Sequence, residues 1–149
     1  MSSATPSGVV FFGLVVLHAG LAALGLGAKA VVAADTDSLA VRATTDNRGL
    51  NDRSEAELQV ALGSVETLSE LLAPRRADLL LCNILAPVIE ALSPGFEELL
   101  QPDGRALLSG LLVDQAPRLK EVLGGLGWMV TAEAEQGRWG LLEIRRRPA

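Results

Sequence analysis

VVFFGLVVLHAGLAALGLGA, residues 9–28, is the stretch on which the fold of this chain depends, and it has three possible interpretations. No residue from Met1 to Ala28 has a charged side chain when histidine is neutral, so the stretch is long and apolar enough for a membrane span. An export signal would show basic residues before its apolar run, and none precedes this one. The third possibility is the first strand, turn and helix of a buried nucleotide-binding unit.

Beyond this stretch, short apolar runs alternate with segments that have helical spacing or helix caps. The expected strands are residues 9–12, 30–34, 58–62, 77–84 and 105–112, and the expected helices lie in residues 17–28, 38–46, 65–72, 85–92, 93–100 and 114–126. Asp37 or Ser38 can cap the second of these helices, and Asp114 can cap the last. Strands that alternate with helices predict a mostly parallel sheet with helices on both faces.

Helix-ending and turn-forming residues predict the remaining boundaries of the helices and strands. Asn47–Gly49 is expected to end the second helix, and Pro102–Gly104 predicts a turn. Gln136–Gly137 predicts a two-residue loop between two antiparallel strands, residues 128–135 and 138–147. We expect a single domain over residues 9–149, preceded by a disordered N-terminus at residues 1–8.

The alternating pattern favours the buried interpretation of residues 9–28. In a doubly wound sheet the first strand is central and buried on both faces, so it should be purely apolar. VVFF as that strand, followed by a loop and helix, explains the apolar character without a bilayer. A membrane-anchored small protein remains the alternative.

The net charge and the cysteine and histidine counts limit the kinds of partner and metal site that the chain is expected to have. The formal net charge is −5, which argues against a nucleic-acid-binding surface and favours a basic protein partner. Cys82 is the single cysteine, so an internal disulfide and a multi-cysteine zinc site are excluded, and a cytoplasmic location is expected. His18 is the single histidine and has no acidic or cysteine neighbour that would indicate a metal site.

Ligands of open α/β sheets bind beyond the carboxyl ends of the strands. Asp35 ends the second strand and could accept hydrogen bonds from a ribose diol, or it could be a helix-capping acid, a role that Asp37 fits equally well. Asn83 ends the fourth strand and could orient a neutral amine, or it could cap the following helix. Gly13 is the only glycine early in the first loop, where bulky residues surround it.

The polarity of the remaining large side chains predicts whether they lie in the core or in solvent. Trp128, Trp139, Phe96 and Leu119 are expected to fill the core around the C-terminal hairpin. Arg145–Arg147 is expected to be the solvated end of the last strand.

One long segment resembles a known family. DLLLCNILAPVIEALSPGFEELLQPDGRALLSGLLVDQ, together with GAKAVVAADTDSLAV, resembles the catalytic domain of the bacterial methyltransferases that act on ribosomal protein eleven of the large subunit. NILAP followed by a strand that ends in SG is typical of that family. The resemblance covers about residues 20–147 and implies a Rossmann-like class I methyltransferase with strand order 3-2-1-4-5-7-6.

The resemblance also implies a cofactor and roles for particular residues. S-adenosylmethionine would be the methyl donor, with Asp35 on its ribose and Gly63–Ser64 near its adenine, and with Gly13 and Asn83 also among the residues that bind it. Asn83, with the backbone of Ile84 and Leu85, would position the target amine of a basic, ribosomal protein substrate. The methyl group would move by direct displacement to a neutral amine, and catalysis would come mostly from proximity and orientation. A monomer is expected.

The sequence departs from the family before Gly20. The family's first strand and loop resemble VLDxGxGSG, whereas here Phe11 stands in the place of the aspartate and Gly13 is the only glycine kept. The family's upstream GTGxHxTT segment has no counterpart. These departures make binding of the cofactor an open question and suggest a truncated or frame-shifted reading of a family gene. A catalytically impaired pseudoenzyme that acts as a protein-binding module is the alternative function.

Overall fold

The computed structural model describes residues 8–13 and 16–149, with side chains described for Gly8 and from Gly20 onward. The predicted disordered segment, residues 1–8, lies outside the described residues except for Gly8. That residue begins the first strand, so the predicted boundary was one residue late.

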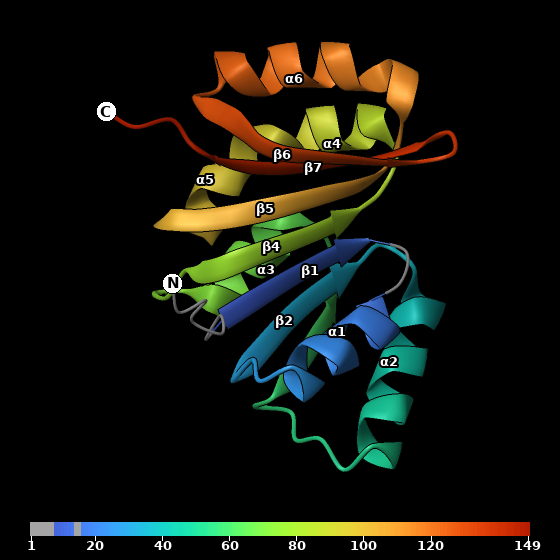
Figure 1. Cartoon of the computed structure of the whole chain (residues 1–149). Helices are drawn as coiled ribbons and strands as arrows, with labels where there is room; N and C mark the ends of the chain where they lie inside the picture. The colour runs from blue at the N-terminus through green and yellow to red at the C-terminus, as the bar shows by residue number, and fades with distance from the viewer. Residues whose placement is uncertain (1–7, 14–15) are drawn as a thin grey trace.

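The chain alternates strands and helices and ends in a hairpin (Figure 1). The strands are β1 (Gly8–Gly13), β2 (Ala30–Asp35), β3 (Leu58–Leu62), β4 (Ala77–Asn83), β5 (Leu100–Leu112), β6 (Trp128–Gln136) and β7 (Trp139–Arg146). The helices are α1 (Val16–Gly25), α2 (Ser38–Leu50), α3 (Val65–Leu72), α4 (Ala86–Leu92), α5 (Phe96–Leu99) and α6 (Ala116–Gly125), with short 3-10 turns η1 (Ser93–Gly95) and η2 (Val113–Gln115).

The described strands form one seven-stranded sheet in the order β3-β2-β1-β4-β5-β7-β6, as predicted. Strands β1 to β5 pair in parallel, and β7 pairs antiparallel with both β5 and β6. The predicted fold class is therefore confirmed. Residues 9–12 lie in the central strand β1, and no helix in the described part of the chain is long and apolar enough to cross a membrane.

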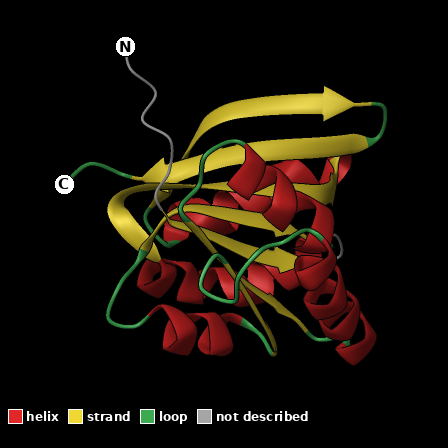
Figure 2. Ribbon diagram, turned by 90° about the horizontal axis from the view of Figure 1, so that it is seen from below, coloured by secondary structure: helices red, strands yellow, loops and turns green. Residues whose placement is uncertain are grey.

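Two apolar cores lie on opposite faces of the sheet (Figures 1 and 2). On the face covered by α1, residues such as Leu24, Val31 and Leu58 form the smaller core. On the other face, α3 to α6 cover the larger core, which includes Leu68 of α3 and Leu108 of β5. We call these the α1 face and the α6 face. In α3, Val65, Leu68 and Leu72 recur at helical spacing, and all three are buried.

Several predicted boundaries were wrong. Helix α2 continues through Gly49 to Leu50. Its C-cap is Asn51, whose backbone N–H donates to carbonyl oxygens of the last turn, and not Asn47. Pro102–Gly104 does not form a free turn but is part of β5, where the pairing with β4 shifts between Ala77 and Leu79. At this irregularity β5 has more residues than the facing part of β4, so Pro102 needs no N–H for pairing and the strand continues past it.

Further corrections concern the C-terminal third. Asp114 lies within η2 and does not cap α6, which starts after Gln115. The loop of the hairpin is Gly137–Arg138, one residue later than predicted, because Gln136 still pairs with Trp139. Gly137 has a φ of 61°, which suits the first position of such a loop.

The predicted C-terminal core was correct for Trp128, Phe96 and Leu119 and wrong for Trp139. Trp139 is 55% exposed, because it is the first residue of β7 and directly follows the hairpin loop. The last strand is also not simply solvated. Arg146 donates a hydrogen bond to the Glu97 carboxylate at 2.6 Å and lies 5.0 Å from the centroid of the Trp128 ring.

Candidate functional site

The candidate residues come together at the carboxyl edge of the parallel strands. The register places Asn83 of β4 beside Gly13 on one side and beside Ser109 of β5 on the other. Asp35 ends β2 opposite Leu62 of β3. Because β1 and β4 are adjacent at the centre of the sheet, the strand order alone brings these chain-distant residues to one edge.

Asp35 is 8% exposed and lies at the tip of β2. One carboxylate oxygen, Oδ1, accepts a hydrogen bond from the backbone N–H of Asp37 at 2.8 Å. Asp37 in turn caps α2 by accepting the backbone N–H of Leu39 at 2.9 Å. The helix cap is therefore Asp37. Among the described residues, none donates to the second carboxylate oxygen of Asp35, which is available to a ligand hydroxyl.

Gly63 and Ser64 follow β3 and lie next to this acid. The backbone N–H of Gly63 donates to the carbonyl oxygen of Asp35 at 2.9 Å. A Cβ at Gly63 would lie 1.9 Å from the Thr67 hydroxyl, so no side chain fits there. That hydroxyl also accepts the backbone N–H of Ser64 at 3.3 Å. Glycine is therefore required at this tight turn, because the Thr67 side chain fills the space that a Cβ would take.

Asn83 lies in a pocket of about 720 Å³ between the end of β4 and the C-terminal hairpin. The lining residues are Asn83, Ile84, Leu85, Ser109, Gly110, Ala134, Glu135, Gln136, Trp139, Gly140 and Leu141. Leu85 is 61% exposed at this pocket and is the N-cap of α4, so Asn83 does not have the capping role that was one of its two alternatives. All three predicted catalytic residues, Asn83, Ile84 and Leu85, therefore line one pocket.

Gly110 packs closely against the Asn83 side chain and the turn after β4. Its φ is +83°, and a Cβ there would lie 2.7 Å from the Ile84 carbonyl oxygen and 2.8 Å from Asn83 Oδ1. The backbone N–H of Ile84 donates to the carbonyl oxygen of Ser109 at 3.2 Å. The backbone of β5 thus packs directly on the residues that carry the predicted chemistry.

Sequence reasoning missed the contribution of the hairpin to this pocket. Gln136, Trp139 and Leu141 line it, although they lie more than 50 residues after Asn83 in the chain. An exposed aromatic ring beside an amide is typical of a site that binds a long side chain, because the ring contacts its alkyl part. The two glycines that flank Trp139 at positions 137 and 140 are the local signal that could have indicated a turn with an exposed ring.

Cys82 precedes Asn83 but is not part of the pocket. It is buried in the larger core, and burial raises the pKa of its thiol to about 12. Burial and a raised pKa make this thiol a poor nucleophile at neutral pH. Over the described residues, no group of three or more metal-binding side chains gathers at any point. The site is thus built from an amide, a carboxylate, backbone groups and apolar walls.

Comparisons with known proteins place this geometry in a family. The model of the ribosomal protein L11 methyltransferase (PrmA) family matches residues 15–147. A curated ribosomal protein L11 methyltransferase from Parasynechococcus marenigrum (strain WH8102) is 77% identical over 128 residues, which are 86% of this chain and 44% of that relative. A second, from Synechococcus sp. (strain RCC307), is 63% identical over 127 residues, or 85% of this chain and 42% of the relative.

A solved structure shows the same fold. The ribosomal protein L11 methylase from Lactobacillus delbrueckii subsp. bulgaricus superposes with a TM-score of 0.86 at 26% identity, and the match covers 99% of this chain and 73% of that one. This chain spans less than half the length of the curated relatives it matches. The family match nevertheless covers most of the chain, and the fold agrees with it. The chain therefore belongs to the ribosomal protein L11 methyltransferase (PrmA) family.

Proposed function

We propose that this chain is the catalytic domain of an S-adenosylmethionine-dependent protein N-methyltransferase whose substrate is a basic ribosomal protein. The observation that carries the proposal is the pocket at the end of β4, where Asn83, Ile84 and Leu85 face the hairpin. Membership of the family supports methyl transfer as the reaction type. The curated relatives named ribosomal protein L11 methyltransferase support a ribosomal protein as the substrate. In this proposal the domain is monomeric and cytoplasmic.

The described residues fit the nucleoside end of S-adenosylmethionine. Asp35 has a carboxylate oxygen that would accept hydrogen bonds from the ribose hydroxyls, and the turn at Gly63–Ser64, which is hydrogen-bonded to Asp35, would lie near the adenine. Gly13 is adjacent to Asn83 in the sheet, so its backbone would be near the reactive end. When bound, S-adenosylmethionine supplies a methyl group on a positively charged sulfur.

The residues of the chain would act on the acceptor by positioning it. The Asn83 amide oxygen and the Ile84 carbonyl oxygen would accept hydrogen bonds from an amine nitrogen, which directs the lone pair along one line, whereas the Leu85 carbonyl oxygen already accepts the backbone N–H groups of Val88 and Ile89. Trp139 and Leu141 would pack along the alkyl part of the acceptor side chain. Holding the two reactants at contact distance converts a bimolecular step into one within a complex. The pocket is open to solvent, so the amine can lose its proton to water before transfer.

Isothermal titration with S-adenosylmethionine tests whether the chain binds the cofactor. We expect binding with a Kd below about 1 mM. The matched variants are Asp35→Asn, which should weaken binding by at least about tenfold because it removes an anionic acceptor, and Asp37→Asn, which should leave it within about twofold because asparagine also caps helices.

A second arm tests the substrate. The chain, S-adenosylmethionine with a labelled methyl group, and purified large-subunit ribosomal protein eleven should give label in the protein, and Asn83→Ala should abolish this transfer even at a cofactor concentration that saturates the variant. Absence of cofactor binding at millimolar concentration would refute the enzymatic function and favour a protein-binding role.

A further inference from the structure

A small pocket opens at the amino edge of the sheet, at the opposite end of the strands from Asp35 and Asn83. Its volume is about 150 Å³, and it lies between the first residues of β1 and β2 and the end of α3. Lys29, Arg75 and Arg76 line it, and none of its other described lining residues is charged. We call it the amino-edge pocket.

Two segments that are far apart in the chain bring these cations together. Lys29 lies in the loop between α1 and β2, and Arg75 and Arg76 lie in the turn between α3 and β4. The backbone N–H of Arg75 donates to the carbonyl oxygen of Leu72 at 2.9 Å. The Gln101 side-chain amide donates to the carbonyl oxygen of Arg76 at 3.2 Å. The turn is therefore tied to α3 on one side and to β5 on the other, so the backbone that carries the two arginines is fixed before a ligand arrives.

The inner wall of the pocket is apolar and leaves room for an ion. Val32 and Leu72 line it, and both belong to the larger core. A Cβ at Gly8 would have only the Cα of Ala77 within 4 Å among the described residues, at 3.8 Å, so the space beside Gly8 is open. An anion in this space would lose water on its inner side, and its attraction to nearby cations would increase because water screens them less.

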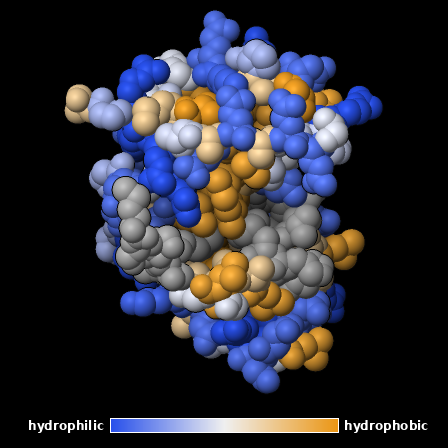
Figure 3. Space-filling model, in the orientation of Figure 1, coloured by the Kyte–Doolittle hydropathy of each residue, from blue (hydrophilic) through white to orange (hydrophobic). Residues whose placement is uncertain are grey.

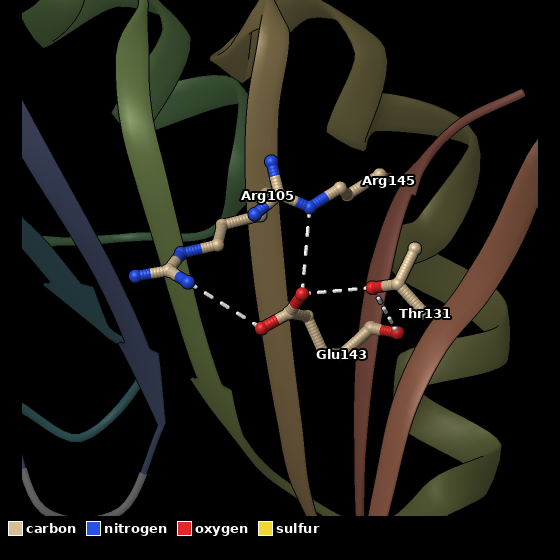
Figure 4. Close-up of polar contacts among 4 residues, drawn as sticks. All are labelled: Arg105, Thr131, Glu143 and Arg145. Atoms are coloured by element: carbon tan, nitrogen blue, oxygen red, sulfur yellow. Dashed lines mark hydrogen bonds and ion pairs between the residues drawn. The ribbon is translucent and has the colours of Figure 1, made fainter. Parts of the chain in front are cut away.

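The pocket cations lack carboxylate partners, which distinguishes them from arginines of the C-terminal strands. Arg105 and Arg145 both pair with Glu143, at 3.5 Å and 3.4 Å (Figure 4). Within the described part of the chain, no carboxylate forms an ion pair with any of the three pocket cations. Their charge is therefore available to an anionic ligand.

The acids near the pocket are engaged elsewhere. The hydrogen bond and charge of Arg146 lower the pKa of Glu97, and the charge of Arg76 adds a smaller effect. Glu97 accepts the Arg146 hydrogen bond at 2.6 Å, so its carboxylate is bound to a different arginine. The Asp78 carboxylate accepts the backbone N–H of Gly8 at 3.0 Å and does not line the pocket. Figure 3 shows hydrophobic residues at the centre of the view and mostly hydrophilic ones along its left edge, where Figure 1 shows the amino ends of the strands.

We infer that the amino-edge pocket binds a phosphate group, either as the free ion or as a phosphate monoester. Guanidinium groups donate paired N–H bonds to phosphate oxygens, and the lysine adds a point charge. Three cations favour an anion with nearly two negative charges at pH 7 over a carboxylate with one. A volume of about 150 Å³ suits a small ion or the phosphorylated end of a small molecule. Since the cofactor of the proposed methyl transfer would bind at the carboxyl edge, this site does not depend on that function.

NMR titration of the isotope-labelled full chain tests the inference, with backbone amide shifts as the measurement. The probes are inorganic phosphate, glycerol phosphate and acetate at constant ionic strength. We expect phosphate to shift the amide signals of Ala30 and Arg75 with a Kd below about 1 mM and to leave those of Asp35 and Asn83 unchanged. Acetate should bind at least about tenfold more weakly, because it has one charge and no third oxygen.

Two double variants with the same loss of charge show whether the pocket is responsible. Arg75→Gln with Arg76→Gln should weaken phosphate binding by at least about tenfold. Arg42→Gln with Arg138→Gln removes two exposed arginines that have no ion pair with another described residue, and it should change binding by less than about twofold. All four arginines are exposed, so both variants should keep the circular dichroism spectrum of the native chain.

The two phosphate probes distinguish the source of the group. Glycerol phosphate that binds as tightly as inorganic phosphate assigns a monoester, and binding at least about tenfold weaker assigns the free ion. Three results would overturn the inference: no shift at Ala30 with about 10 mM phosphate, acetate binding as tight as phosphate, or equal losses of affinity in the two double variants.

Discussion

Gly110→Ala should destabilise the chain by about 2–5 kcal/mol, because the added methyl group meets backbone atoms and the glycine has a positive φ. The left-handed backbone, with φ of +83°, costs a residue with a Cβ about 1–2 kcal/mol. The Cβ would also lie 2.7 Å from the Ile84 carbonyl oxygen and 2.9 Å from the Ile84 nitrogen. Relieving such overlap in a packed region costs about 1–3 kcal/mol more.

Gly137→Ala is the matched control for the backbone part of this effect. Gly137 has a φ of +61° in the hairpin loop, and a Cβ there would have nothing within 4 Å. Its replacement by alanine should therefore cost only about 1–2 kcal/mol. The difference between the two variants isolates the overlap with Asn83 and Ile84.

Urea unfolding followed by circular dichroism measures the difference. With a slope of about 2 kcal/mol/M, an extra loss of about 1–3 kcal/mol lowers the midpoint of Gly110→Ala below that of Gly137→Ala by about 0.5–1.5 M. The slopes should be equal, which shows that stability and not compactness has changed. If Gly110→Ala proves as stable as Gly137→Ala, the close packing of β5 on the pocket residues is refuted.

Three further outcomes are expected. The Thr131 hydrogen bond, with Arg105 and Arg145, lowers the pKa of Glu143, so its stabilisation is present above the ordinary carboxyl pKa and is lost as pH falls through the lowered one. Glu143→Gln should therefore cost about 1 kcal/mol in urea unfolding at pH 7, and this cost should shrink steadily as the pH is lowered below the ordinary carboxyl pKa; a cost that stays constant on acidification would contradict this. Burial, with a pKa of about 12, should keep Cys82 unreactive to a disulfide reagent at pH 8 until the chain unfolds, and rapid reaction of the native chain would disprove that burial. Trp139 is 55% exposed, so acrylamide should quench its fluorescence, whereas Trp139→Phe should leave only the shielded emission of Trp128, and equal quenching in both proteins would count against this geometry.

The order and type of the elements could be predicted from the sequence, because both depend on local patterns. Alternating apolar runs and helical spacing predicted the type and order of the elements. Helix α3 at Val65–Leu72 was predicted to the residue, whereas β5 begins at Leu100 and not at Arg105 as predicted. The resemblance at NILAP gave the strand order, which the sheet confirms. Boundaries failed where the sheet overrode local turn chemistry, as at Pro102–Gly104, which β5 absorbs through a shift in its pairing with β4.

The candidate site was predictable only in part. Asp35 and Asn83 could be located because strand ends carry ligand-binding residues in open α/β sheets. Their roles in binding and catalysis remain predictions. The far wall of the pocket was not predicted, because it is formed by the hairpin, and the glycines near Trp139 indicate a turn but not that the hairpin reaches Asn83.

The sequence by itself determined the alternation of strands and helices, the apolar central strand and the polar residues at the strand tips, since each follows from side-chain size, polarity and spacing along the chain. Only the tertiary structure decided which tips meet, that Trp139 lies at the pocket beside Asn83 and that three cations gather at the amino edge. These features depend on register and on the extent of each strand beyond its neighbours. They arise from hydrogen bonding between segments far apart in the chain, and no local pattern records that.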